Sequence, residues 1–372
     1  MPSFFEGIVA DQGLQAGISA LLEVMKDEDL SMRRGAAELL GDLGPEATEA
    51  LPVLIESLKS SDPWLPVVAA KAVWSIDPGN EQAIRVLITG LSHEYSGVRE
   101  SAENTLKEIG SPAVQSLIEA MTTASQRGAV KVLGGIGTDA VPALTESLTH
   151  EDARTREGSA RALAEIGPVA KSAVPALTQA LRDEKSPVRE WAAWALGKIG
   201  PGAVDAVPAL IQSLNDQADL VRLRAAMSLG EIGPSAAAAV EALTDAMRDR
   251  DTSVRVFAAE ALLRVGQPAV VALPVLIDAL AGDDTYAASM ARHCLGDMGP
   301  EAVEPLVAVL KNEKAQARLF AAQSLESIGP AAKMAIPALT EALNDENEKV
   351  RDWAAHALDR IQPKHDTTVS KP

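Results

Sequence analysis

Residues 221–234 of the chain read VRLRAAMSLGEIGP, and closely related strings recur at a fixed interval. Residues 188–201 read VREWAAWALGKIGP, so the two copies lie 33 residues apart. Self-similarity with a period of about 20–50 residues is typical of solenoid proteins, in which each repeat packs on its neighbours. The repeat therefore predicts an elongated array of stacked units, and it favours a binding surface over an enzyme active site.

Each repeat ends at a turn residue that is usually glycine. The turn residues are Gly44, Asp77, Gly110, Gly137, Gly167, Gly200, Gly233, Gly266, Gly299, Gly329 and Gln362. The intervals are 33, 33, 27, 30, 33, 33, 33, 33, 30 and 33 residues, which defines eleven units over residues 13–362. We interpret residues 1–12 as a lead-in and the polar residues 363–372 as a disordered tail.

Each unit is predicted to form two helices, as unit 201–233 illustrates. Apolar residues recur at helical spacing over 203–214 and again over 220–232, on either side of a polar turn. Gly233 is expected to be left-handed at the helix end, and a proline is suited to the start of the next helix. Pro208 and its equivalents should kink the first helices or delay their regular start. The sequence thus predicts an all-α, right-handed superhelical solenoid of about eleven two-helix repeats.

This pattern resembles the HEAT-repeat family, and most closely the short repeats named after phycobilisome lyases. The residues that carry the resemblance are AVPAL at 206–210, Asp216 in the turn, Val221-Arg222 and Ala225-Ala226. The resemblance covers nearly the whole chain. It implies an α-solenoid, but one fold hosts many functions.

Two enzymatic relatives within this resemblance suggest alternative functions. Deoxyhypusine hydroxylase is a HEAT-like di-iron enzyme with repeated His-Glu pairs, whereas this chain has only two such pairs, His93-Glu94 and His150-Glu151. That difference disfavours a related oxidoreductase activity. Phycobilin lyases handle bilin chromophores and need no metal motif, so the sequence leaves this role open. We expect no catalytic residues, metal or cofactor.

The formal net charge of −18 argues against nucleic acid as the main partner, because a solenoid that binds nucleic acid needs a basic stripe. It favours solubility and a basic protein or peptide partner. The single cysteine, Cys294, excludes an intramolecular disulfide and fits a reducing compartment. The start of the chain has no secretory pattern, and no apolar stretch is long enough to span a bilayer. We therefore expect a cytoplasmic protein that is not inserted in membranes.

The second helix of each repeat lines the concave side in HEAT proteins, so the resemblance places a binding surface there. At 100° per residue, Glu190 and Trp194 lie opposite the buried stripe of unit 168–200. Later units have Leu223, Met227, Val256 and Leu319 at the equivalent positions, whereas the first five units are mostly polar there. Contiguous exposed apolar residues often mark binding sites, and tryptophan is enriched among interface hot spots.

We therefore predict non-catalytic protein or peptide binding on the concave face of residues 168–362, in a scaffold or regulatory subunit. The expected anchors are Trp194 and Met227. The expected apolar floor comprises Leu223, Val256 and Leu319. The carboxylates expected to pair with basic groups of the partner are Glu190, Glu260 and Asp352.

A second ladder, on the flank of the same helices, also holds aromatic residues. Its aromatic members are Trp191, Phe257, Phe320 and Trp353. Either they pack between repeats, where the second alanine of each Ala-Ala pair leaves room, or they contribute to the binding surface.

The short units 111–137 and 138–167 interrupt the 33-residue register. Gly134 and Gly135 weaken the second helix of the first of these by up to ~1 kcal/mol each. The interruption predicts either a hinge near residues 120–140 or a deletion that a shorter loop absorbs.

Overall fold

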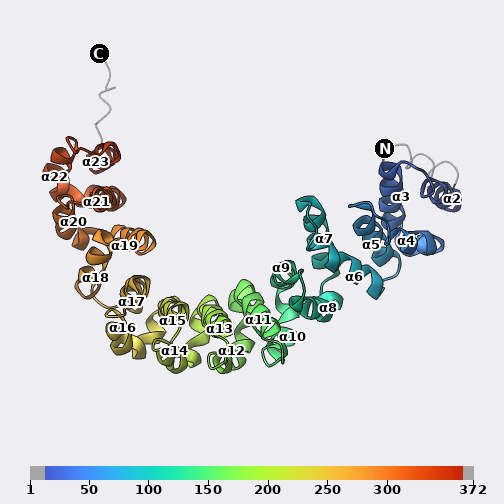
Figure 1. The fold of residues 1–372 in the computed structure, drawn as a ribbon, viewed down its shortest axis with the longest axis horizontal. Helices are drawn as coiled ribbons and strands as arrows, with labels where there is room; N and C mark the ends of the chain where they lie inside the picture. The colour runs from blue at the N-terminus through green and yellow to red at the C-terminus, as the bar shows by residue number, and fades with distance from the viewer. Residues whose placement is uncertain (1–12, 363–372) are drawn as a thin grey trace, which may run out of the picture. The chain divides into compact units, whose positions relative to one another are not determined.

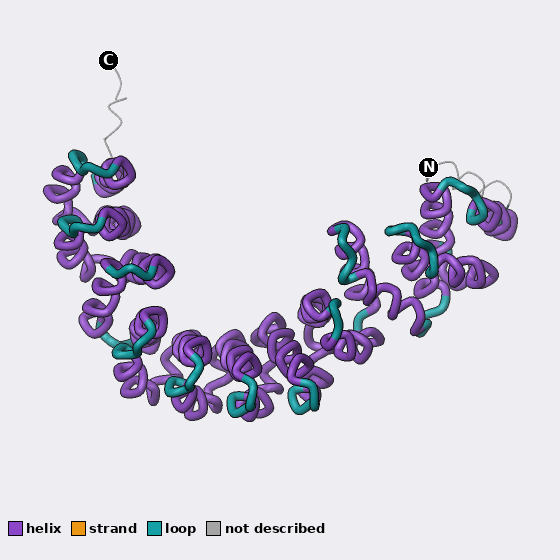
Figure 2. Tube along the Cα trace, in the orientation of Figure 1, coloured by secondary structure: helices purple, strands orange, loops and turns teal. Residues whose placement is uncertain are grey.

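The computed structural model describes residues 13–362, and every regular element in this range is a helix (Figure 2). The predicted lead-in 1–12 and tail 363–372 lie outside the described residues. Most repeats combine a short outer helix, which follows a 3-10 segment, with a longer second helix. The all-α superhelical solenoid predicted from the sequence is confirmed.

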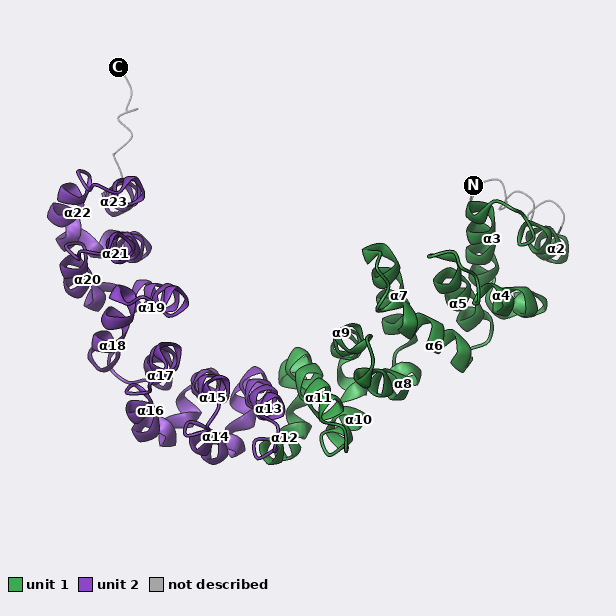
Figure 3. Ribbon diagram, in the orientation of Figure 1, with its two compact units in different colours: residues 1–180 green, residues 181–372 purple. Residues whose placement is uncertain are grey.

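The chain divides into two compact units, unit 1 (residues 1–180) and unit 2 (residues 181–372), which are coloured separately in Figure 3. The helices of unit 1 are α2 Leu14–Val24, α3 Leu30–Asp42, η1 Gly44–Ala50, α4 Leu51–Ser57, α5 Leu65–Ile76, α6 Glu81–Gly90, α7 Ser96–Ile109, η2 Ser111–Ala113, α8 Val114–Glu119, η3 Ala120–Thr122, α9 Gln126–Ile136, η4 Gly137–Ala140, α10 Val141–Ser147, α11 Ala153–Ile166, η5 Gly167–Ala173 and α12 Val174–Ala180. The helices of unit 2 are α13 Ser186–Ile199, η6 Gly200–Ala206, α14 Val207–Ser213, α15 Asp219–Ile232, η7 Gly233–Ala239, α16 Val240–Ala246, α17 Thr252–Val265, α18 Ala269–Ala281, α19 Thr285–Met298, η8 Gly299–Ala302, α20 Val303–Val309, α21 Ala315–Ile328, η9 Gly329–Ala335, α22 Ile336–Ala342 and α23 Glu348–Ile361.

In several repeats a proline marks the delayed regular start of the first helix, as the sequence predicts, whereas Pro274 lies inside the continuous helix α18. In the repeat 201–233, the segment expected to be one helix is divided into η6 and α14. Pro208 lies in the first turn of α14, where its missing N–H leaves no hydrogen bond unmade. Ala203 and Ala206 of η6 are fully buried. The 3-10 segment is therefore a packing element that carries two small residues three positions apart.

The turn glycines have the predicted positive φ, but most of them are not left-handed helical. Gly200 has φ 69° and ψ −139°, and the next residues enter η6 directly. Gly266 has φ 102° and ψ 20°, which is the left-handed conformation, and no 3-10 segment follows it. The extended ψ of Gly200 is therefore followed directly by helical backbone in η6. Asp77 and Gln362 close their repeats at φ −128° and −130°, which needs no glycine.

In unit 2 the long helices α13, α15, α17, α19, α21 and α23 form an inner row, and the short helices lie outside them (Figure 1). Neighbouring long helices pack side by side, α15 between α13 and α17. Small residues permit this close approach, because a Cβ added at Gly197 would lie 2.9 Å from the Cα of Ser228. Leu196, Leu229 and Leu262 occupy equivalent positions 33 residues apart. All three are fully buried and contribute to the core.

An arginine in the first turn of several long helices joins consecutive repeats. Arg222 donates from Nε and Nη2 to the carboxylate of Asp249, at 2.7 and 2.9 Å. Its Nη1 donates to the carbonyl oxygen of Asp216 in its own turn, at 2.9 Å. The same bidentate pairing joins Arg189 to Asp216 and Arg318 to Asp345. We call these three pairs the Arg–Asp ladder; each one fixes the turn of one repeat against the long helix before it.

Two repeats of unit 1 depart from this plan. The repeat 78–110 enters α6 without a 3-10 segment, and the repeat 111–137 has only the three-residue η2 in that place. The long helix α9 is correspondingly short, at 11 residues against 14 for α7 and α11. The division into compact units falls at residues 180 and 181. The predicted hinge near 120–140 remains a prediction.

Candidate functional site

The predicted anchor Trp194 lies on the inner row of unit 2 and is half-buried. Lys198 Nζ lies 4.3 Å from the centre of its ring, and the guanidinium carbon of Arg224 lies 4.6 Å from it. Cations at this distance are attracted by the negative face of an indole. The helix wheel predicted a tryptophan that points into solvent, whereas two long cationic side chains cover part of the ring.

Arg224 connects the anchor to its neighbours. It comes from α15, and its Nε lies 3.4 Å from Oε1 of Glu190 on α13. Its Nη1 lies 3.8 Å from the sulfur of Met227, which is half-buried on the same helix. Glu190, Trp194, Arg224 and Met227 thus form one contiguous cluster, which we call the Trp194 cluster. Arg224 was not among the predicted site residues, although a long cation next to an aromatic ladder is a signal that could have indicated its role.

The expected apolar floor is largely absent from the surface. Leu223 is 8% exposed and Val256 is 0% exposed, so the prediction that these side chains are accessible is wrong. The long helices α15 and α17 pack against their neighbours on both sides, and Val256 belongs to the buried core there. Leu319 is half-buried and packs against the core of the last repeats. A helical wheel describes one helix alone and does not show which side chains the adjacent repeat covers. This explains why Leu223 and Val256 were wrongly predicted to be accessible.

The flank aromatics mainly fill space between repeats. Phe257 is 5% exposed, and its ring centre lies 6.4 Å from that of Tyr286 on α19. Phe320 is also buried. Trp353 is half-buried against the core, with its ring centre 5.6 Å from that of His356. Trp191 is half-buried as well. Of the two interpretations of this ladder, packing between repeats is the one that holds for Phe257 and Phe320.

Two of the three predicted carboxylates already have ion-pair partners in the chain. Glu190 pairs with Arg224, and Glu260 pairs with Arg264 four residues later, at 2.9 Å. Arg264 also reaches Glu231 on the neighbouring helix, at 3.2 Å. Asp352 is exposed, and no ion pair joins it to another residue of the described range. Of the three predicted carboxylates, Asp352 therefore remains available for a binding partner, whereas Glu190 and Glu260 already form ion pairs within the chain.

The single cysteine of the chain lies in unit 2, on α19. Cys294 is buried, and burial raises the pKa of its thiol to about 12, with the nearby carboxylates of Glu260 and Asp297 adding to the effect. A thiol with so high a pKa is protonated at neutral pH, so it is a poor nucleophile. Over residues 13–362, no three His, Cys, Asp or Glu side chains gather closely enough to hold a metal ion together.

Histidines outside this region have local structural contacts. His93 and His150 each accept, through Nδ1, the backbone N–H of the residue two positions later, at 3.1 and 3.0 Å. They replace the turn aspartate of other repeats. None of the helices in the described range combines the length and the apolar composition needed to cross a membrane.

Similarity to known proteins agrees with this architecture. The family model described as HEAT repeats matches residues 51–128, 122–196, 169–230, 207–296 and 273–359. No curated protein shows significant sequence similarity to the chain. Solved structures with a similar fold include Kap121p bound to Ste12p and Kap121p bound to Pho4p, each with 15% identity and a TM-score of 0.61.

In both of those comparisons the alignment covers 92% of this chain and 45% of the other, so the chain spans just under half of Kap121p. An engineered protein aligns over 92% of this chain and 98% of its own length, with 23% identity and a TM-score of 0.42. The likeness to Kap121p concerns the fold. The finer resemblance to phycobilisome-lyase-type repeats remains a prediction. Because the family model matches most of its length, the chain belongs to the HEAT-repeat family.

Proposed function

We propose that the chain is a non-catalytic scaffold that binds a protein or peptide through the inner row of unit 2, at the Trp194 cluster. The observation that carries this proposal is the half-buried indole of Trp194, held beside the thioether of Met227 by Arg224. Tryptophan and arginine are the residue types most enriched among interface hot spots, and methionine adapts to varied apolar partners.

The geometry also indicates what the partner contributes. Because Lys198 and Arg224 lie over the indole, the partner reaches the remaining ring surface and the sulfur of Met227. An apolar side chain fits this contact. The net charge of −18 favours basic sequences during approach, and Asp352 supplies an unpaired carboxylate on the same row. A cytoplasmic location is part of this proposal.

The test is affinity capture with the full chain, followed by titration of each captured protein in purified form. The variants are Trp194→Ala and Met227→Asp. The matched control is Met334→Asp, because Met334 is 77% exposed on η9, away from the cluster, and the substitution adds the same charge. Circular dichroism checks that all variants remain helical.

We expect a partner of this surface to bind at least about tenfold more weakly to both cluster variants and normally to the control. A set of partners that binds all four proteins equally would contradict the proposal.

A further inference from the structure

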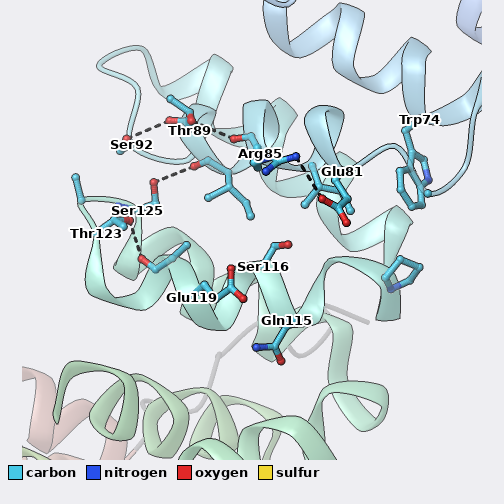
Figure 4. A pocket seen from close by; sticks show the side chains of 16 residues that line it. Trp74, Glu81, Arg85, Thr89, Ser92, Gln115, Ser116, Glu119, Thr123 and Ser125 are labelled. Carbon is cyan, nitrogen blue, oxygen red and sulfur yellow. Dashed lines mark hydrogen bonds and ion pairs between the residues drawn. The ribbon is translucent and has the colours of Figure 1, made fainter. Parts of the chain in front are cut away.

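A second surface feature lies in unit 1, between the short helices α6 and α8. A groove with a volume of about 900 Å³ separates them (Figure 4). Trp74 lies at one end and Ser125 at the other, where the Ser125 hydroxyl donates to the carbonyl oxygen of Ile88 at 2.9 Å. Ser116 and Glu119 of α8 line the groove opposite α6.

The groove occupies the place that a 3-10 segment fills in regular repeats. In unit 2, α14 packs against its own segment η6 and against η7 of the following repeat. The segment η7 buries Ala236 and Ala239, three positions apart. The repeat that follows α6 has only the three-residue η2, and α6 has no comparable packing against a 3-10 segment in the described range. The short repeat therefore leaves a space shaped for one turn or more of helix.

The lining of this space combines apolar surface with negative charge. Its apolar part includes the half-buried Trp74 and Ile88. Its charged side chains are Glu81, Arg85 and Glu119. Arg85 is four residues after Glu81 and pairs with it at 3.3 Å. Glu119 is exposed, and no ion pair joins it to another residue of the described range. A ligand that supplies a cation next to small apolar side chains complements both properties.

We propose that this groove binds a short helical segment of a basic partner protein. Small or medium apolar side chains of the segment, three or four positions apart, fill the space that the first part of a regular 3-10 segment would occupy, since Ala113 of η2 still holds the second of the two buried alanine positions. A lysine or arginine of the segment pairs with Glu119. The groove lies in unit 1, so this proposal concerns a different surface from the one proposed in unit 2.

The experiment uses a phage-displayed library of random peptides, which is panned against the full chain. Individual peptides are then synthesised with a fluorescent label and titrated by anisotropy. Ser116→Trp and Thr89→Trp fill the groove from α8 and α6, respectively, and Glu119→Lys reverses its free charge. The control is Glu241→Lys, an exposed glutamate on α16 in unit 2 that gives the same change in net charge.

We expect the recovered peptides to be basic, with apolar residues three or four positions apart. Filling the groove should weaken binding at least about tenfold, and Glu119→Lys about threefold or more, whereas Glu241→Lys should bind within about twofold of the native chain. Circular dichroism confirms folding, and the two filling variants come from different helices, so one of them remains informative if the other is unstable.

Amide hydrogen exchange on the complex locates the peptide. Protection of residues 81–90 and 114–124 supports the proposal. Protection of α13 and α15 instead would overturn it and would favour the surface proposed in unit 2. Recovery of acidic peptides would overturn it as well, and so would the absence of any peptide whose affinity falls in the filled variants.

Discussion

The two units of the molecule use one repeat in different ways. In most of unit 2, the buried Arg–Asp ladder joins long helices to the following turns, and a seven-residue 3-10 segment packs between short helices, although no 3-10 segment precedes α18 and η8 has four residues. In unit 1, Arg34 of α3 pairs in a similar way with Asp62 of the following turn, but Arg99, at the helix position of Arg222, donates to the carbonyl oxygens of His93 and Glu94, and no ion pair joins it to a carboxylate of the described range. The adjacent repeat lacks the full 3-10 segment, and a groove remains. A HEAT-like repeat can therefore lose a packing element without losing its helices.

The largest effect that distinguishes the units should come from the ladder arginine. Arg222→Met leaves the carboxylate of Asp249 without its partner in a mostly buried place, which should lower the free energy of unfolding by about 3 kcal/mol. Arg99→Met removes only hydrogen bonds to carbonyl oxygens and should cost about 1 kcal/mol. Urea denaturation measures both variants. Equal losses would show that the inter-repeat ion pair does not make Arg222 contribute more to stability than Arg99.

A smaller effect should follow from adding one methyl group to each unit. A Cβ at Gly197 would lie 2.4 Å from the hydroxyl oxygen of Ser228, so Gly197→Ala should destabilise unit 2 by about 1–3 kcal/mol. Gly35 on α3 has nothing within 4 Å of an added Cβ, and Gly35→Ala should stabilise unit 1 by about 0.5–1 kcal/mol. Thermal melting gives the sign of each change. A stabilising Gly197→Ala would mean that α13 and α15 separate at little cost.

The smallest of these effects is a change in the free energy of unfolding at low pH. The hydrogen bond from Arg318 lowers the pKa of Asp345 below its ordinary 3.8; burial opposes this shift, and the backbone N–H of Asn347 adds to it. Because the pKa of the native carboxyl is depressed, its contribution to stability is present above about pH 4 and is lost as the pH falls through the native pKa.

Asp345→Asn should therefore lower stability at neutral pH by about 1–2 kcal/mol, less than Arg222→Met, because Glu346 still pairs with Arg318 at 3.1 Å. The difference from the native chain should shrink on acidification below about pH 4. Denaturation curves at several pH values measure it. A difference that grows in acid would reverse the assigned direction of the pKa shift.

Much of the fold could be predicted from local patterns. The period of 33 residues, the polar turns and the glycine-proline pairs predict the helix boundaries, because these features act within a few residues of the chain. The long helix expected over 220–232 is α15, Asp219–Ile232. The division of the first helix into a 3-10 segment and an α-helix was only partly predicted, since a proline indicates a delayed start but not the geometry that precedes it.

The candidate site was less predictable, because it depends on neighbours that are distant in the sequence. Trp194 and Met227 were identified from their ladder, and both reach the surface in part. Val256 occupies an equivalent ladder position and is fully buried. The pairing of Arg224 with Glu190 joins residues 34 positions apart, and a single-helix wheel does not represent it.

The sequence by itself determined the repeat, the helical content and the family, because periodicity and turn residues encode interactions within one unit. Only the tertiary structure decided which ladder residues are accessible, since burial depends on how closely adjacent repeats approach. It also decided that the shortened repeat of unit 1 leaves an acidic groove: a deletion removes residues from the sequence, but whether neighbouring helices close over the gap is settled by their packing.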